Sequence, residues 1–101
     1  MKKLIIASSL ALLTNFVYAS ADKTAESYQL HCASCHGANR LGGMGPALLP
    51  ENLKRLRKKK ASKVIANGRA ATQMPAFTSK LSDKEIQSLV DYVYTPLTKI
   101  P

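Results

Sequence analysis

The sequence is poor in the residue types that acid–base catalysis and large cores require. Its 101 residues include no Trp, two Cys, two His and only six Asp or Glu, against 15 Lys or Arg, so the formal net charge is +9. A chain of this length excludes a multidomain enzyme. Because no paired acid and base stands out among so few carboxylates and imidazoles, we expect a small domain that is not itself an enzyme.

The N-terminal segment has the pattern of a secretory signal peptide. Two lysines precede an apolar run from Leu4 to Leu13, and a small residue follows at the position that a signal peptidase reads. We predict residues 1–19 as the signal peptide and 20–101 as the mature domain, with cleavage after Ala21 as the near alternative. An uncleaved anchor is the other interpretation, but the apolar run is short for a membrane span. We therefore expect a periplasmic protein without stable membrane insertion.

Natural domains of this size usually need a covalent crosslink or a bound metal for stability, and the two cysteines are placed to form such a crosslink. Cys32 and Cys35 are three residues apart, and His36 follows at once. This C-x-x-C-H arrangement is the one used for covalent haem attachment. Residues three apart on a helical turn point to one side, so both sulfurs can reach one porphyrin edge while His36 projects toward the iron. One haem c, attached through both cysteines, is expected.

Three other uses of the cysteines are less favoured. A thioredoxin-like dithiol needs a βαβ context, and the flanking sequence has no strand pattern. A zinc site needs a fourth ligand, and His31 abuts Cys32 too closely to close a tetrahedron. A disulfide across so short a loop would restrict the unfolded chain very little.

A second axial ligand to the iron is expected from a distant part of the chain. Met44 follows His36 by only eight residues, too few to travel easily to the opposite face of a porphyrin. Met74 comes after a whole predicted helix, so we predict His36 and Met74 as the two metal ligands. Arg69, beside the Met74 loop, is expected to pair with a haem propionate.

Helical patterns cover most of the remaining chain. We predict a helix over 22–35 that delivers the haem cysteines, with Asp22 as its cap. Four glycines and two prolines then mark a loop over 37–50. A helical stretch over 50–67 follows, broken near 59–62 if Ser62 caps a second helix.

The clearest helix follows Ser82. Gly68 is predicted as the C-cap of the preceding stretch, and Ser82 with Glu85 forms a capping box. Ile86, Leu89, Val90 and Val93 give the last helix an apolar stripe, and Pro96 ends it. The expectation is an all-α domain of three to five short helices around one haem, with Tyr28 and Tyr92 where the first and last helices cross.

Three separated motifs, in this order, resemble those of small class I bacterial cytochromes c: Cys32-x-x-Cys35-His36-Gly37, then Gly45-Pro46-Ala47-Leu48, then Gly68-Arg69 with Met74-Pro75-Ala76-Phe77. The resemblance implies the class I cytochrome c fold, with the Pro46 carbonyl accepting the His36 Nδ1 proton. Residues 41–53 and 69–75 are more specifically similar to the periplasmic cytochromes encoded beside cytochrome cd-type nitrite reductase in denitrifying bacteria. They are also similar to the haem c domain of a related protein that acts late in haem d biosynthesis.

Ligation by His36 and Met74 leaves no open iron position, so electron transfer is the expected function. The favoured interpretation is a one-electron shuttle to a respiratory reductase, with cytochrome cd-type nitrite reductase as the partner that the resemblance implies. One alternative is an electron acceptor for a dehydrogenase in haem d biosynthesis. Another is a sensor in which a gas displaces Met74.

A run of basic residues leads us to expect acidic proteins as partners. Seven of the ten residues from Lys54 to Lys63 are Lys or Arg. Such a run is either a docking surface that steers acidic redox partners or a solvated helix face that keeps the protein soluble. Export makes nucleic acid an unsuitable partner. His31 is expected to be exposed and structural.

Overall fold

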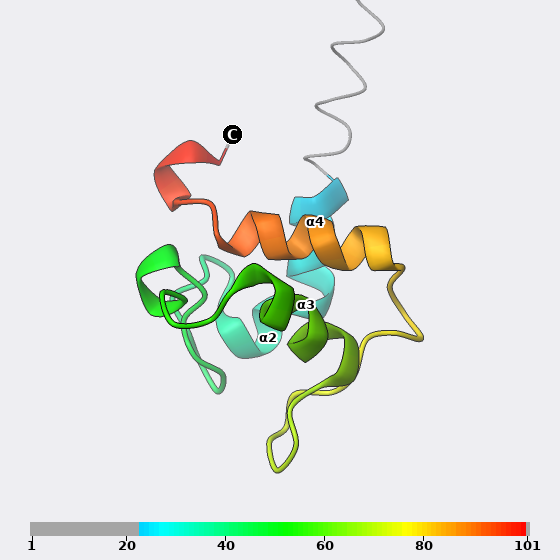
Figure 1. The fold of residues 1–101 in the computed structure, drawn as a ribbon. Helices are drawn as coiled ribbons and strands as arrows, with labels where there is room; N and C mark the ends of the chain where they lie inside the picture. The colour runs from blue at the N-terminus through cyan, green and yellow to red at the C-terminus, as the bar shows by residue number, and fades with distance from the viewer. Residues whose placement is uncertain (1–22, 101) are drawn as a thin grey trace, which may run out of the picture.

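Helices account for all the regular structure in the part of the chain that the structure describes. The computed structural model describes residues 23–100. A first helix covers 23–31, and it is followed by α2 (Ala33–His36), η1 (Pro50–Asn52), α3 (Lys58–Asn67), α4 (Asp83–Val93) and η2 (Leu97–Lys99) (Figure 1). Residues 23–100 contain no strand. The all-α prediction is confirmed. The predicted signal peptide and the Asp22 cap lie outside the described residues.

The N-terminal helix is interrupted at Cys32, so the prediction of one helix over 22–35 is wrong at this residue. Cys32 has φ −119°, outside the range of a regular helix. Its N–H still donates to the Tyr28 carbonyl (2.8 Å), and its own carbonyl accepts from both Cys35 and His36 (3.2 and 2.9 Å). The chain bends here, and α2 carries Cys35 and His36 as a separate turn.

The predicted helical stretch over 50–67 is interrupted earlier in the chain than the sequence predicts. Residues 53–57 are non-helical, and α3 starts at Lys58, not near Ser62. Ser62 is not a cap, because its hydroxyl donates to the Lys58 carbonyl inside α3 (3.2 Å). The break lies where Leu53 turns into the core and the Leu56 carbonyl accepts from the Tyr94 hydroxyl. Tertiary contacts of these two leucines therefore override the local helical pattern.

Helix α4 confirms the predicted capping box and buried stripe. Glu85 N–H donates to Ser82 Oγ (3.1 Å), and Ser82 N–H donates to Glu85 Oε1 (2.9 Å). The four predicted apolar side chains are all buried: Ile86, Leu89, Val90 and Val93. The helix ends at Val93, and Pro96 follows three residues later, where it cannot continue the helix.

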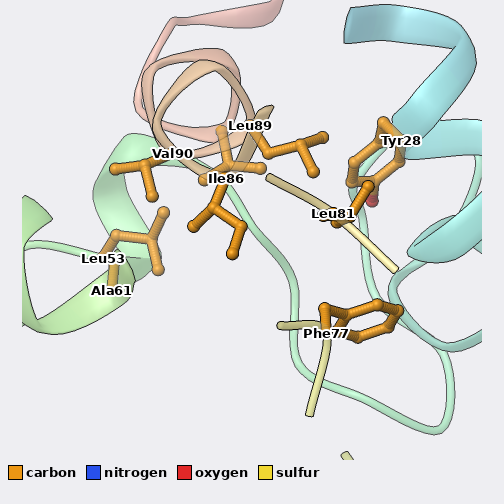
Figure 2. Close-up of a cluster of buried hydrophobic side chains, with 9 residues drawn as sticks. Tyr28, Leu53, Ala61, Phe77, Leu81, Ile86, Leu89 and Val90 are labelled. Atoms are coloured by element: carbon orange, nitrogen blue, oxygen red, sulfur yellow. The ribbon is translucent and has the colours of Figure 1, made fainter. Parts of the chain in front are cut away.

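The core lies beneath α4 (Figure 2). From α4, the Ile86 and Val90 side chains point toward Leu53 and Ala61, and the Leu89 side chain points toward Tyr28. The same buried cluster contains Phe77, Leu81 and Val93. The predicted contact between the first and last helices is confirmed, because the Tyr28 and Tyr92 ring centroids are 5.4 Å apart. Among residues 23–100, no helix has the length and apolar character needed to cross a membrane.

Candidate functional site

A cavity of about 770 Å³ opens beside this core. Its volume lies within the roughly 300–1,000 Å³ typical of cofactor pockets. Its walls come from α2, the loop over 37–48, the segment from η1 to α3, the loop over 68–77 and the inner side of α4, and most of the lining side chains are apolar. All six predicted site residues line it: Cys32, Cys35, His36, Pro46, Arg69 and Met74.

The His36 ring is fixed by a hydrogen bond to Pro46. Its Nδ1 lies 2.7 Å from the Pro46 carbonyl oxygen. Because a carbonyl can only accept, Nδ1 carries the proton, which leaves the Nε2 lone pair free to bind a metal. Gly45 makes this geometry possible, since a Cβ there would lie 2.9 Å from His36 Cε1. The contact between His36 and Pro46 is the one that the family resemblance implies.

Both cysteines lie at the wall of the cavity and do not form a disulfide with each other. Burial, with a smaller contribution from Cys35, raises the pKa of the Cys32 thiol to about 11. No strand flanks the motif within residues 23–100, so the βαβ context that a thioredoxin-like dithiol needs is not found there. In the described part of the chain, no group of three or more His, Cys, Asp or Glu side chains is arranged to share a metal ion, so the zinc interpretation gains no support.

Met74 enters the cavity from a loop that follows α3. Gly68 ends α3 with φ +72°, as predicted, and its N–H donates to the Val64 carbonyl (2.8 Å). A Cβ at Gly68 would lie only 2.7 Å from the Met74 carbonyl oxygen, so glycine is needed for both the φ angle and the close approach. Met44 also lines the cavity, but its side chain is 78% exposed.

Two of the residues that line the cavity are arginines. Arg55 and Arg69 are exposed and line it. Arg55 belongs to a basic surface whose other exposed members are Lys54, Arg57, Lys58, Lys59, Lys60 and Lys63. Arg55 is the one member of this basic surface that lines the cavity. His31 also lines the cavity and is only half-buried, with its ring 5.8 Å from that of Phe77, so the expectation that it is exposed is wrong.

Arg40 is a structural residue that the sequence analysis missed. Its side chain is 1% exposed, and it donates to the carbonyls of Tyr92 (2.5 Å) and Thr95 (2.6 Å). Among residues 23–100, its Nε has no hydrogen-bond partner. Through Arg40 the loop that holds Pro46 is tied to the end of α4. No local pattern distinguishes this arginine from an exposed one, because its partners are more than 50 residues away in the sequence.

An all-helical fold around a cavity walled by C-x-x-C-H, a metal-competent imidazole and a thioether defines the class of c-type cytochrome domains. A family described as "Cytochrome C oxidase, cbb3-type, subunit III" matches residues 19–93, and the chain belongs to this family.

The chain is similar to small c-type cytochromes and to part of a larger dehydrogenase. It is 45% identical, over 89% of its length, to 18% of "Dihydro-heme d1 dehydrogenase" from Pseudomonas aeruginosa (strain PAO1), and 40% identical over 59% of its length to half of "Cytochrome c55X" from the same organism. Among solved structures, "c-type cytochrome NirC" matches with a TM-score of 0.68 and 33% identity, covering 72% of this chain and 86% of that one. A dihydro-heme d1 dehydrogenase structure, NirN, matches with a TM-score of 0.69 and 50% identity over 16% of its chain. The chain thus spans about half, or less, of the curated relatives it matches.

Family membership implies a covalently bound haem c, and the residues present fit that group. The cavity has the size of a cofactor site, the thiols lie at its wall, and His36 keeps a free Nε2. The chain resembles the c-type cytochrome NirC over most of that protein's length, and it resembles only a small part of NirN, which is named as a dehydrogenase.

Proposed function

We propose that this chain is a periplasmic one-electron carrier, exported by a signal peptide over residues 1–19. Cys32 and Cys35 would hold a single haem c, with His36 and Met74 as its axial ligands. The bound haem would supply an iron that alternates between the ferrous and ferric states. The observation that carries the proposal is the placement of all four side chains in the wall of one cavity.

The chain's own residues have distinct tasks in this function. Pro46 holds the His36 tautomer that can bind iron, and the apolar walls limit access of water. Met74 would hold the iron as its second ligand and would leave no position for a substrate, which suits electron transfer. A thioether in an apolar site favours the ferrous state, which raises the reduction potential. Arg69, exposed and near the same loop, would neutralise a haem propionate.

Acidic redox proteins are the proposed partners, and the basic surface is the proposed docking site. Its seven side chains are exposed, and Arg55 places it at the cavity edge. In the described part of the chain, Lys58 is its only member that forms a salt bridge, with Asp91 at 3.2 Å. A positive surface beside the site of electron exchange increases the rate of encounter with an acidic partner and makes that rate depend on salt. Cytochrome cd-type nitrite reductase is the partner that the sequence resemblance supports.

A second candidate function is supported by one observation. The identity to a protein named dihydro-heme d1 dehydrogenase is 45%, over a small part of that protein. This chain could therefore accept electrons from a dehydrogenase in haem d biosynthesis. The iron chemistry would be the same, and only the direction of electron flow with each partner would differ.

Partner assays separate the two candidates. We expect the ferrous protein to be oxidised rapidly by cytochrome cd-type nitrite reductase, at a rate that falls as ionic strength rises. The variant Lys59→Glu/Lys60→Glu should slow this reaction. Lys84→Glu/Lys99→Glu changes the net charge equally at exposed sites outside the basic surface and should slow the reaction much less. Reduction of the ferric protein by the dehydrogenase, with no oxidation by the reductase, would favour the second candidate.

Two outcomes would overturn parts of this proposal. A purified protein without a covalently bound haem would remove the electron-carrier function altogether. A reaction rate that does not depend on ionic strength, or equal slowing in both charge-reversal variants, would remove the basic surface as the docking site while leaving the carrier function in place.

A further inference from the structure

The loop that carries Met74 is closed by its own hydrogen bonds. Arg69 N–H donates to the Met74 carbonyl (3.3 Å), which brings the two ends of the loop together. Within it, the Thr72 N–H and the Thr72 hydroxyl both donate to the Arg69 carbonyl, at 3.2 and 2.7 Å. Thr72 Oγ1 in turn accepts a hydrogen bond from the Met74 N–H at 3.3 Å. One hydroxyl thus joins the beginning and the end of the loop.

Thr72 Oγ1 has a particular importance for Met74. Within residues 23–100, it is the acceptor that the structure gives to the Met74 N–H. The loop also contains Ala71 with φ +61°, a conformation that L residues other than Asn and Asp rarely adopt. A backbone held in such a conformation persists only when surrounding bonds hold it there. The Thr72 bridge supplies two of those bonds.

We propose that Thr72 is a positioning residue for Met74. By bridging the Arg69 carbonyl and the Met74 N–H, its hydroxyl fixes the backbone from which the Met74 side chain enters the cavity. This inference rests on the proposed function, in which Met74 is the axial ligand. Loss of the hydroxyl would release the Met74 backbone and increase the fraction of molecules in which the thioether has left its position. External ligands would then bind more tightly in proportion to that fraction.

The haem-loaded parent protein and three variants of it test the proposal. Thr72→Val removes the hydroxyl and keeps the shape of the side chain, and Thr72→Ser keeps the hydroxyl. Thr78→Val is the matched control, because Thr78 is an exposed threonine that lies outside the cavity lining and outside the Arg69–Met74 loop. Two properties are measured for each ferric protein. The first is the intensity of the weak red absorption band that arises from charge transfer between a methionine ligand and ferric iron, called the red band below. The second is the affinity for imidazole at neutral pH.

The expected results differ between the variants. Thr72→Val should bind imidazole about fivefold more tightly than the parent and show a weaker red band, because both exposed hydrogen bonds of the Thr72 hydroxyl are lost, including the one from the Met74 N–H. Thr72→Ser and Thr78→Val should stay within about twofold of the parent, which matches the scatter of substitutions at exposed sites. If Thr72→Val does not accumulate as a folded haem protein, Thr72→Ala removes the same hydroxyl without adding a methyl group.

The outcomes that contradict the proposal are distinct. A parent-like red band and parent-like imidazole affinity in Thr72→Val would show that the hydroxyl does not position Met74. A loss in Thr72→Ser as large as that in Thr72→Val would assign the effect to the methyl group and would also overturn it. A parent protein without the red band would overturn the proposed Met74 ligation itself, and this inference with it.

Discussion

The guanidinium of Arg40 lies over the ring of Tyr92, with its central carbon 5.2 Å from the ring centroid, and donates to the Tyr92 carbonyl. Tyr92 also packs against Tyr28, whose hydroxyl donates to the Gly37 carbonyl (2.9 Å). The backbone N–H of Arg40 donates to the same Gly37 carbonyl (3.1 Å). One buried arginine therefore connects the chain that follows His36, the first helix and the end of α4.

Replacing Arg40 by Met should lower the free energy of unfolding by about 2–4 kcal/mol. The variant keeps much of the side-chain volume but leaves the Tyr92 and Thr95 carbonyls without their charged donor, and each such bond contributes about 1.5–3 kcal/mol. Relief from burying a charge offsets part of this loss. Denaturant unfolding of the haem protein measures it. Arg57→Met, at an exposed position, should change stability by no more than about 0.5 kcal/mol. A loss below about 1 kcal/mol for Arg40→Met would contradict the structural role.

The sequence was informative where a local pattern and the tertiary structure agree. The Ser82 capping box, the stripe of α4 and the Gly68 C-cap each depend on residues within one or two turns, and the structure contains all three. The close placement of Cys32, Cys35 and His36 also follows from their spacing in the sequence. These features needed no knowledge of distant contacts.

The features that the sequence analysis missed depend on distant contacts. The burial of Arg40 is decided by carbonyls in the last part of the chain, and the break over 53–57 by Leu53 in the core and by the Tyr94 hydroxyl. The bend at Cys32 has no helix-breaking residue to announce it. Local propensity favoured helix at both breaks, and tertiary packing prevailed over it.

Gly68 and Ala71 should respond in opposite directions to exchange of glycine and alanine. Both have positive φ angles, +72° and +61°. Gly68→Ala adds a Cβ 2.7 Å from the Met74 carbonyl oxygen in addition to the backbone strain, and it should cost at least about 2 kcal/mol. Ala71→Gly removes strain of about 1–2 kcal/mol but makes the unfolded chain more flexible, so a gain of up to about 1 kcal/mol is expected. Thermal unfolding of both variants measures the difference, and a Gly68→Ala variant as stable as the parent would show that this turn is not constrained.

Met74→Ala should open the proposed sixth iron position. The red methionine-to-iron band should disappear, the reduction potential should fall because a ligand that favours ferrous iron is lost, and carbon monoxide should bind rapidly to the ferrous form. Met44→Ala is the matched control, since Met44 also lines the cavity but is 78% exposed. It should keep the band and bind external ligands within about threefold of the parent. Loss of the band in Met44→Ala and its retention in Met74→Ala would exchange the roles of the two methionines.

Glu85 should make the stability of the protein depend on pH in the acid range. Hydrogen bonds from Ser82, first from its backbone N–H, lower the pKa of the Glu85 carboxyl below its ordinary value. A group whose pKa is lower in the folded state stabilises the fold above its unfolded pKa of about 4.3, and this stabilisation is lost as the pH falls through the folded pKa. Glu85→Gln should therefore unfold at a lower temperature than the parent near neutral pH, and the two melting temperatures should converge as the pH falls through the folded pKa of Glu85. Glu26→Gln, at an exposed site in the first helix, should not alter the acid dependence in this way. A constant difference between the parent and Glu85→Gln at every pH would show that the carboxylate charge contributes nothing to the cap of α4.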